Sequence, residues 1–132
     1  MRTFNPWVLL VLLVTHSAPT LAADLNGAWT INTASCDQVF TKKNNRIAFK
    51  QDADLNAGGM IVQGKQVTGT FQKCTIKSFR NDGSDVKVIA SCSDGVTISD
   101  VSFDVKISGE NNITLSSKEP VPVEMQYVRC QL

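Results

Sequence analysis

Four cysteines are the residues of this chain with the most obvious chemistry. As thiolates they could act as nucleophiles or zinc ligands, whereas as disulfides they would staple a small domain. Their even number, in a chain that begins with an export-type segment, favours two disulfides. The only histidine, His16, lies inside that first segment, so the rest of the chain has no imidazole base or ligand. The four residues are Cys36, Cys74, Cys92 and Cys130.

The spacing of Cys74 and Cys92 predicts that they pair. Residues 81–85, Asn-Asp-Gly-Ser-Asp, are typical of a tight turn, and each cysteine lies nine residues from Gly83. Folding the chain about Gly83 places the two cysteines opposite each other on neighbouring strands, close enough for a disulfide. Cys36 and Cys130 are then left to form the second bond.

The chain offers few groups for catalysis. It has no P-loop, no dinucleotide-binding fingerprint and, beyond His16, no Ser-His-Asp or Cys-His arrangement. The remaining enzymatic alternative is acid–base chemistry by a pair of carboxylates among its 12 acidic residues, as in glycoside hydrolysis. Asp82, Ser84 and Asp85 lack the EF-hand pattern and are explained by turn chemistry. We expect a non-enzymatic protein with no catalytic residue, no cofactor and no metal site.

Two groups of side chains are candidates for binding. The first consists of aromatic residues that would surround an apolar ligand, or would instead fill the core, as a sole tryptophan in a small barrel often does. The second is the densest positive cluster, which could bind an anion or an acidic partner, or could be a solvated loop face. The aromatic group is Trp29, Phe49, Phe71 and Phe103, and the positive cluster is Lys42, Lys43 and Arg46.

The candidate binding residues must be positioned by β-strands, in which apolar and polar side chains alternate with a period of two. The clearest signal covers 96–107, where Val101, Phe103, Val105 and Ile107 alternate with polar residues. Residues 35–43 are ambiguous between a short helix and an irregular segment. About eight short antiparallel strands, with turn signals every 8–15 residues, predict a small β-barrel, with a β-sandwich as the alternative. The other predicted strands are 25–33, 46–51, 60–63, 66–79, 86–92, 113–116 and 123–130.

Residues 1–23 have the layout of a secretory signal peptide. Arg2 precedes an apolar run over residues 7–14 and a region of small residues. The run is shorter than the roughly 20 residues that a membrane span requires. We therefore expect cleavage, a single domain over 24–132 without a membrane span, and a secreted or periplasmic location. Without Arg2, the chain has 12 basic and 12 acidic residues, so its net charge is about zero and no attraction to nucleic acid is expected.

Short motifs carry a family resemblance. Residues 25–29, Leu-Asn-Gly-Ala-Trp, resemble the Gly-x-Trp motif in the first strand of lipocalins and other calycin barrels. With Cys36 following, they are also similar to the periplasmic metalloprotease inhibitors of the serralysin-inhibitor type. Residues 36–40, 73–77 and 127–130 resemble a group of small uncharacterised exported bacterial proteins. The resemblance implies an exported, eight-stranded lipocalin-like barrel and brings no activity with it.

We expect the protein to act by binding and to be a monomer. One hypothesis is a protein-binding module, for example a periplasmic protease inhibitor, that uses surface loops such as 41–45 and 52–59. The other is a carrier of a small apolar ligand inside the barrel. Because about 109 residues supply several large inward side chains, a filled barrel and surface binding are slightly favoured.

Overall fold

The computed structural model describes residues 24–53, 58–83, 85–118 and 121–132. The predicted signal peptide and its cleavage site lie outside these residues. Among the described residues, no helix is long and apolar enough to cross a membrane. The elements are β1 (Gly27–Thr30), the 3₁₀ turn η1 (Thr33–Ser35), α1 (Cys36–Val39), β2 (Phe40–Lys43), β3 (Arg46–Phe49), β4 (Met60–Gln63), β5 (Gln66–Gly69), β6 (Lys73–Asp82), β7 (Asp85–Ser93), β8 (Ile98–Ile107), β9 (Asn112–Ser117) and β10 (Val123–Arg129).

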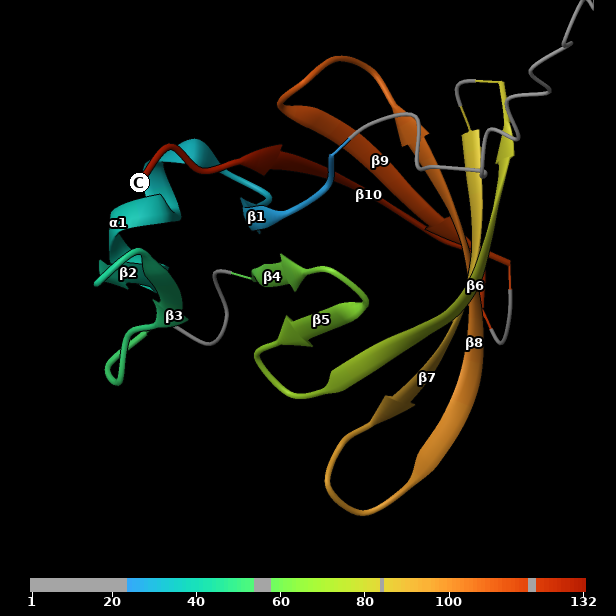
Figure 1. Cartoon of the computed structure of the whole chain (residues 1–132), viewed down its shortest axis with the longest axis horizontal. Helices are drawn as coiled ribbons and strands as arrows, with labels where there is room; N and C mark the ends of the chain where they lie inside the picture. Colours follow the sequence, from blue (N-terminus) through green and yellow to red (C-terminus); the bar gives the residue numbers. More distant parts are fainter. Residues whose placement is uncertain (1–23, 54–57, 84, 119–120) are drawn as a thin grey trace, which may run out of the picture.

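Eight of these strands form a closed antiparallel barrel (Figure 1). Its order is β1-β10-β9-β8-β7-β6-β5-β4, and β4 pairs with β1 to close it. From β4 to β10 every strand lies beside its neighbours in sequence, which is the pattern of an up-and-down barrel. The predicted all-β barrel is therefore confirmed, and the β-sandwich alternative is wrong.

The predicted number of barrel strands is right, but two segments were assigned wrongly. Residues 46–51 contribute β3, which pairs with β2 in a separate two-stranded hairpin. The predicted strand 66–79 divides into β5 and β6, because the chain turns back at residues 70–72. In that turn the N–H of Gly69 donates to the carbonyl of Gln72 at 2.8 Å. Period-two alternation identifies strands but does not show which strands share a sheet.

The unit formed by α1, β2 and β3 packs on the outside of the barrel, at the left of Figure 1. Ala28 of β1 and Ile61 of β4 alternate with inward residues, so their side chains point outward into this contact. Ile47 and Phe49 pack against the same cluster from the hairpin. The unit covers the outer face of the two short strands that close the barrel. The buried members of the cluster are Ala28, Cys36, Val39, Phe40, Ile61 and Cys130.

Both predicted disulfides are confirmed. Cys36–Cys130 joins α1 to the end of β10, with a Cα–Cα distance of 5.6 Å, and Cys74–Cys92 joins β6 to β7. Cys74 lies directly opposite Cys92 in the ladder. Disulfides of this kind persist in oxidising compartments, so the structure is compatible with an exported protein.

Candidate functional site

The inward side chains leave an apolar cavity of about 380 Å³ inside the barrel. Its wall is built by alternate residues of seven consecutive strands, β4 to β10, because side chains with a period of two point to one face. Many of these residues are aliphatic, and the described lining contains no lysine or arginine. The strand residues are Met60, Val62, Val67, Gly69, Cys74, Ile76, Val88, Ala90, Phe103, Val105, Ile113, Leu115 and Tyr127.

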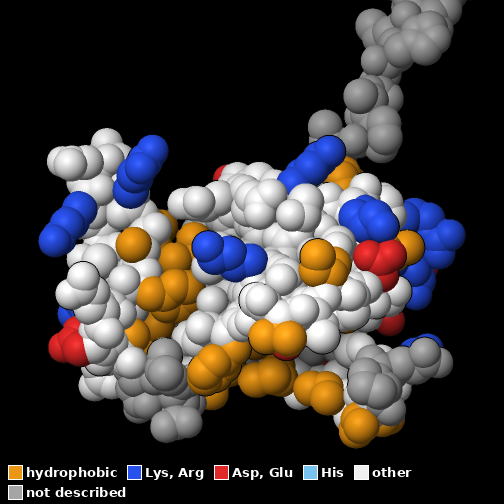
Figure 2. Space-filling model, turned by 90° about the horizontal axis from the view of Figure 1, so that it is seen from below, with side chains coloured by type: hydrophobic (Ala, Val, Ile, Leu, Met, Phe, Trp, Pro, Cys, Tyr) orange, Lys and Arg blue, Asp and Glu red, His pale blue; other side chains and the backbone are white. Residues whose placement is uncertain are grey.

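Loops complete the lining at the end of the barrel where β5 turns into β6. Gly58, Gly59 and residues 70–72 contribute to it, together with Asp94 at the end of β7. Phe71 lines the cavity and yet is 68% exposed, so its ring stands at the boundary between the cavity and solvent. Val96 and Ile98, just beyond Asp94, are also exposed. Figure 2, which views the molecule from below, shows hydrophobic side chains gathered in a band across the lower part of this face.

Two titratable side chains among the described lining residues carry polar groups to the cavity. Burial raises the pKa of the Tyr127 phenol above its ordinary value of 10.0, so the phenol is neutral at physiological pH. Its hydroxyl hydrogen bonds only weakly, to the sulfur of Met125 at 3.8 Å, and is available as a donor to a bound molecule. Asp94 is held as a carboxylate: the backbone N–H of Thr97 and that of Val96 lower its pKa.

Trp29 occupies the core of the barrel and is fully buried. Its indole N–H donates to the carbonyl of Leu25 at 2.9 Å, and the guanidinium of Arg129 lies over its ring. It shares a buried cluster with Val62, Val88 and Ile113, which line the cavity, but it is not itself among the lining residues. The ring therefore fills the barrel beside the cavity.

The other predicted aromatic residues separate into two places. Phe71 and Phe103 both line the cavity. Phe49 lies outside the barrel, where its ring centroid is 5.2 Å from that of Phe40 beneath the β2–β3 hairpin. The structure thus brings two of the four predicted residues together at one cavity and puts Phe49 in a different cluster.

The predicted positive cluster lies on the β2–β3 hairpin. Asn44 and Asn45 form its turn with φ angles of 52° and 61°, and Lys43 lies directly opposite Arg46. Alternation places Lys43 and Arg46 on one face of the hairpin and Lys42 on the other. All three cations are exposed, and none forms an ion pair with another described residue.

The sequence analysis missed most of the cavity wall. Ile76, Val88, Ala90 and Leu115 line the cavity but were not named as site residues. Period-two alternation was a usable signal for Val88 and Ala90, which follow Val86 on the buried face of β7, although their shared neighbour Ile89 is apolar. No pattern in the sequence indicated that the space between these side chains is left unfilled.

Comparisons of this chain with protein-family models, with curated proteins and with solved structures each find no match.

Proposed function

We propose that the protein binds a small, neutral, apolar molecule in the barrel cavity and acts as an exported carrier. The supporting observation is the cavity itself, whose volume of about 380 Å³ falls in the range of about 300–1,000 Å³ that is usual for small-molecule sites. At about 30 Å³ for each water molecule in the liquid, this space corresponds to roughly a dozen waters. A fused ring system or a medium-length chain fits such a volume.

The chemistry of the lining favours a neutral ligand. A charged group moved into an apolar site without a partner is strongly destabilised, and the described lining offers no cation to a carboxylate or phosphate. A ligand hydroxyl or carbonyl can accept a hydrogen bond from Tyr127. The proposal is non-enzymatic, since Asp94 is the only carboxylate among the described lining residues and has no second acid or base beside it there. The protease-inhibitor alternative rests on the resemblance of a short motif, residues 25–29 with Cys36 following.

The location that accompanies this proposal is the periplasm or the extracellular space. Such a compartment is oxidising, so the disulfides of the protein persist there. Both bonds join residues that are far apart in the chain. Native mass spectrometry of the protein purified gently from its source would identify a bound molecule by a fixed added mass that denaturation removes.

The proposal can be tested with the neutral fluorescent probe N-phenyl-1-naphthylamine. Ala90 is 1% exposed and lines the cavity, so Ala90→Leu adds apolar volume where the probe would bind. We expect probe affinity to fall by about ten-fold, the effect of losing roughly 1.4 kcal/mol of apolar contact. Ala48→Leu is the matched control, because Ala48 is exposed on the β2–β3 hairpin.

Competition then examines the charge preference. Decanol should displace the probe at lower concentration than decanoate, because the chains match and only the head group differs. Equal affinity of the wild type and the Ala90→Leu variant for the probe would show that the cavity is not the binding site. Stronger competition by decanoate would contradict the neutral-ligand proposal.

A further inference from the structure

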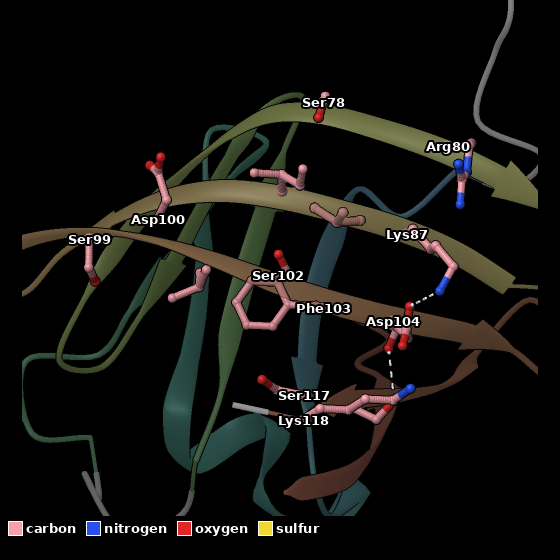
Figure 3. Close-up of a pocket in the computed structure, with 14 residues that line it drawn as sticks. Ser78, Arg80, Lys87, Ser99, Asp100, Ser102, Phe103, Asp104, Ser117 and Lys118 are labelled. Atoms are coloured by element: carbon pink, nitrogen blue, oxygen red, sulfur yellow. Dashed lines mark hydrogen bonds and ion pairs between the residues drawn. The ribbon is translucent and has the colours of Figure 1, made fainter. Parts of the chain in front are cut away.

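Strand β8 has an edge that is covered by a neighbouring strand over only part of its length. Ile98 to Lys106 pair with β7, whereas β9 pairs with β8 only from Asp104 to Ile107. Residues 98–103 therefore have a strand partner on one side only within the described part of the chain. A groove of about 900 Å³ is lined by this segment, by the end of β9 and by residues of β6 and β7, and Figure 3 shows it.

The hydrogen-bond pattern determines which backbone groups of β8 face this groove. In an antiparallel ladder, residue pairs that exchange hydrogen bonds alternate with pairs that do not. The N–H of Asp94 donates to the carbonyl of Thr97 at 3.3 Å on the β7 side, and the N–H of Ser108 donates to the carbonyl of Asn112 at 3.0 Å on the β9 side. Counting in steps of two from these bonds, the odd-numbered residues of β8 bond toward β7 and the even-numbered residues bond toward β9.

This alternation leaves three residues with both main-chain groups directed into the groove. They are Ile98, Asp100 and Ser102, and none of them has a β9 residue opposite. Such a row of N–H and C=O groups is a template for another extended chain, which is why natural proteins usually cover or blunt their strand edges.

The side chains around the groove differ between its two ends. Figure 3 shows Arg80, Lys87 and Lys118 toward one end, and Ser99 and Asp100 toward the other. Lys87 is 3.1 Å from Asp104, whereas neither Arg80 nor Lys118 forms an ion pair with another described residue. The first end therefore has an excess of positive charge.

Between the two ends the groove offers an apolar contact. The ring of Phe103 lies between them and points toward Ser117 and Lys118 (Figure 3). Val101, another inward residue of this part of β8, also lines the groove. An incoming strand would thus meet backbone partners along β8, apolar side chains on one face and unpaired cations at one end.

We propose that residues 98–103 of β8 bind an extended segment of a partner protein by strand addition, with an acidic side chain of that segment beside Arg80 and Lys118. Addition of a strand to a sheet edge is a general mode of peptide recognition, in which main-chain hydrogen bonds give affinity and alternate side chains give specificity. This surface is separate from the proposed ligand cavity, except that Val88 and Phe103 line both.

A second copy of this chain is a poorer occupant of the same edge. If two β8 edges paired so that residues 98, 100 and 102 of each were used, residue 98 would face 102 and Asp100 would face Asp100. Like charges directly opposite each other in a ladder are destabilising. A different chain with an acidic residue at the positive end has no such conflict.

The experiment uses a phage library of short peptides with alternating Val and Thr, in which the residues near both ends are randomised. Selection on the full-length oxidised protein should return peptides with Asp or Glu toward one end. Ser102→Pro removes the N–H that faces the groove, and we expect it to weaken binding of a selected synthetic peptide by about ten-fold. Ser102→Ala is the matched control, because it removes the hydroxyl and keeps the N–H, and should change affinity by less than about two-fold.

The charge and the folding of the variants are examined separately. Arg80→Gln with Lys118→Gln should weaken binding about three-fold and abolish the preference for an acidic end. Circular dichroism shows whether Ser102→Pro folds. If it does not, peptides N-methylated at alternate positions replace it, and only one set of positions should lose binding.

Three results would overturn the proposal. The first is a library that yields no binder. The second is a selected peptide that binds the Ser102→Pro variant as well as the wild type, or that tolerates N-methylation at every position. The third is a concentration-dependent dimer in analytical ultracentrifugation that Ser102→Pro abolishes, which would make a second copy the occupant of this edge.

Discussion

The guanidinium carbon of Arg129 lies 4.4 Å from the centroid of the Trp29 ring, so the last barrel strand is fastened to the first by a cation–π contact. The same guanidinium donates hydrogen bonds to three backbone carbonyls. Its Nη1 bonds to Asn26, Nη2 bonds to Asp24 at 2.6 Å, and Nε bonds to Glu110 at 3.2 Å. Gly27, at φ 132°, makes room for this arrangement, because a Cβ there would lie 3.2 Å from Nη1.

Replacement of Arg129 should therefore destabilise the barrel. Arg129→Lys keeps the charge, but a single ammonium cannot reach carbonyls in three directions. We expect a loss of about 2–3 kcal/mol in the free energy of unfolding, from the cation–π contact and the charged hydrogen bonds together. Urea unfolding followed by circular dichroism measures it. Arg46→Lys, on the exposed hairpin, is the control, and an equal effect of both substitutions would contradict this account.

The two disulfides should contribute unequally to stability. Their cysteines are similarly buried, at 8% and 7% exposure for Cys36 and Cys130 and 6% and 3% for Cys74 and Cys92, so loop length should distinguish them. The sequence separations are 94 and 18 residues. The loop-entropy model then gives about 4–5 kcal/mol for Cys36–Cys130 and about 3 kcal/mol for Cys74–Cys92. Urea unfolding of the two double Cys→Ala variants measures the loss in the free energy of unfolding. A larger loss from removing Cys74–Cys92 than from removing Cys36–Cys130 would contradict this view.

Asp94 should make the turn between β7 and β8 sensitive to acid. Its carboxylate accepts the N–H of Thr97 at 2.8 Å and that of Val96 at 2.9 Å, and these bonds hold its pKa below the ordinary value of 3.8. A lowered pKa means that the stabilisation is present above pH 3.8 and is lost as the pH falls through the folded-state pKa. Asp94→Asn should unfold with a shallower pH dependence than the wild type below that pH.

The control for this prediction is Thr97→Ala, which removes the hydroxyl and keeps both N–H donors. It should retain most of the pH dependence in urea unfolding measured across the acid range. A wild type and an Asp94→Asn variant with the same dependence on pH would show that this carboxylate does not stabilise the turn.

Lys77 is the extra residue of a β-bulge in β6, because Ile76 lies opposite Ala90 and Ser78 lies opposite Ile89. Deleting Lys77 should leave both of these pairs unchanged and keep Cys74 opposite Cys92. Its ion pair with Asp100 is exposed at both ends, so its loss should cost less than about 1 kcal/mol. Peptide mapping of the deletion variant should recover the Cys74–Cys92 bond.

Deletion of Thr75 is the contrasting change. To keep Cys74 opposite Cys92, the shortened strand would have to lose the bulge and turn the Lys77 side chain toward the cavity, which carries an energetic cost. We expect this variant to unfold at lower urea concentration than the Lys77 deletion. Equal stability of the two deletions would contradict the assignment of Lys77 as the bulge.

Sequence reasoning predicted the Cys74–Cys92 pair correctly, although its geometry was incomplete. It folded the chain symmetrically about Gly83, whereas the observed turn places Asp82 opposite Asp85, so its centre lies half a residue later. The bulge at Lys77 then shifts the register back by one residue, and the two differences cancel at Cys74. Bulges are invisible in a pattern of single residues, because they depend on how the partner strand twists.

The amino-acid sequence by itself determined most of the strands, the tight turns and the cysteine pairs, since period-two alternation and turn chemistry are local properties. Only the tertiary structure decided that β3 leaves the barrel, that Phe49 packs outside while Phe71 and Phe103 meet at one cavity, and that the cavity stays open. These outcomes depend on which strands pair and how their side chains fill the enclosed space. Pairing and packing are set by contacts between residues far apart in the chain, such as Trp29 with Arg129 and Cys36 with Cys130.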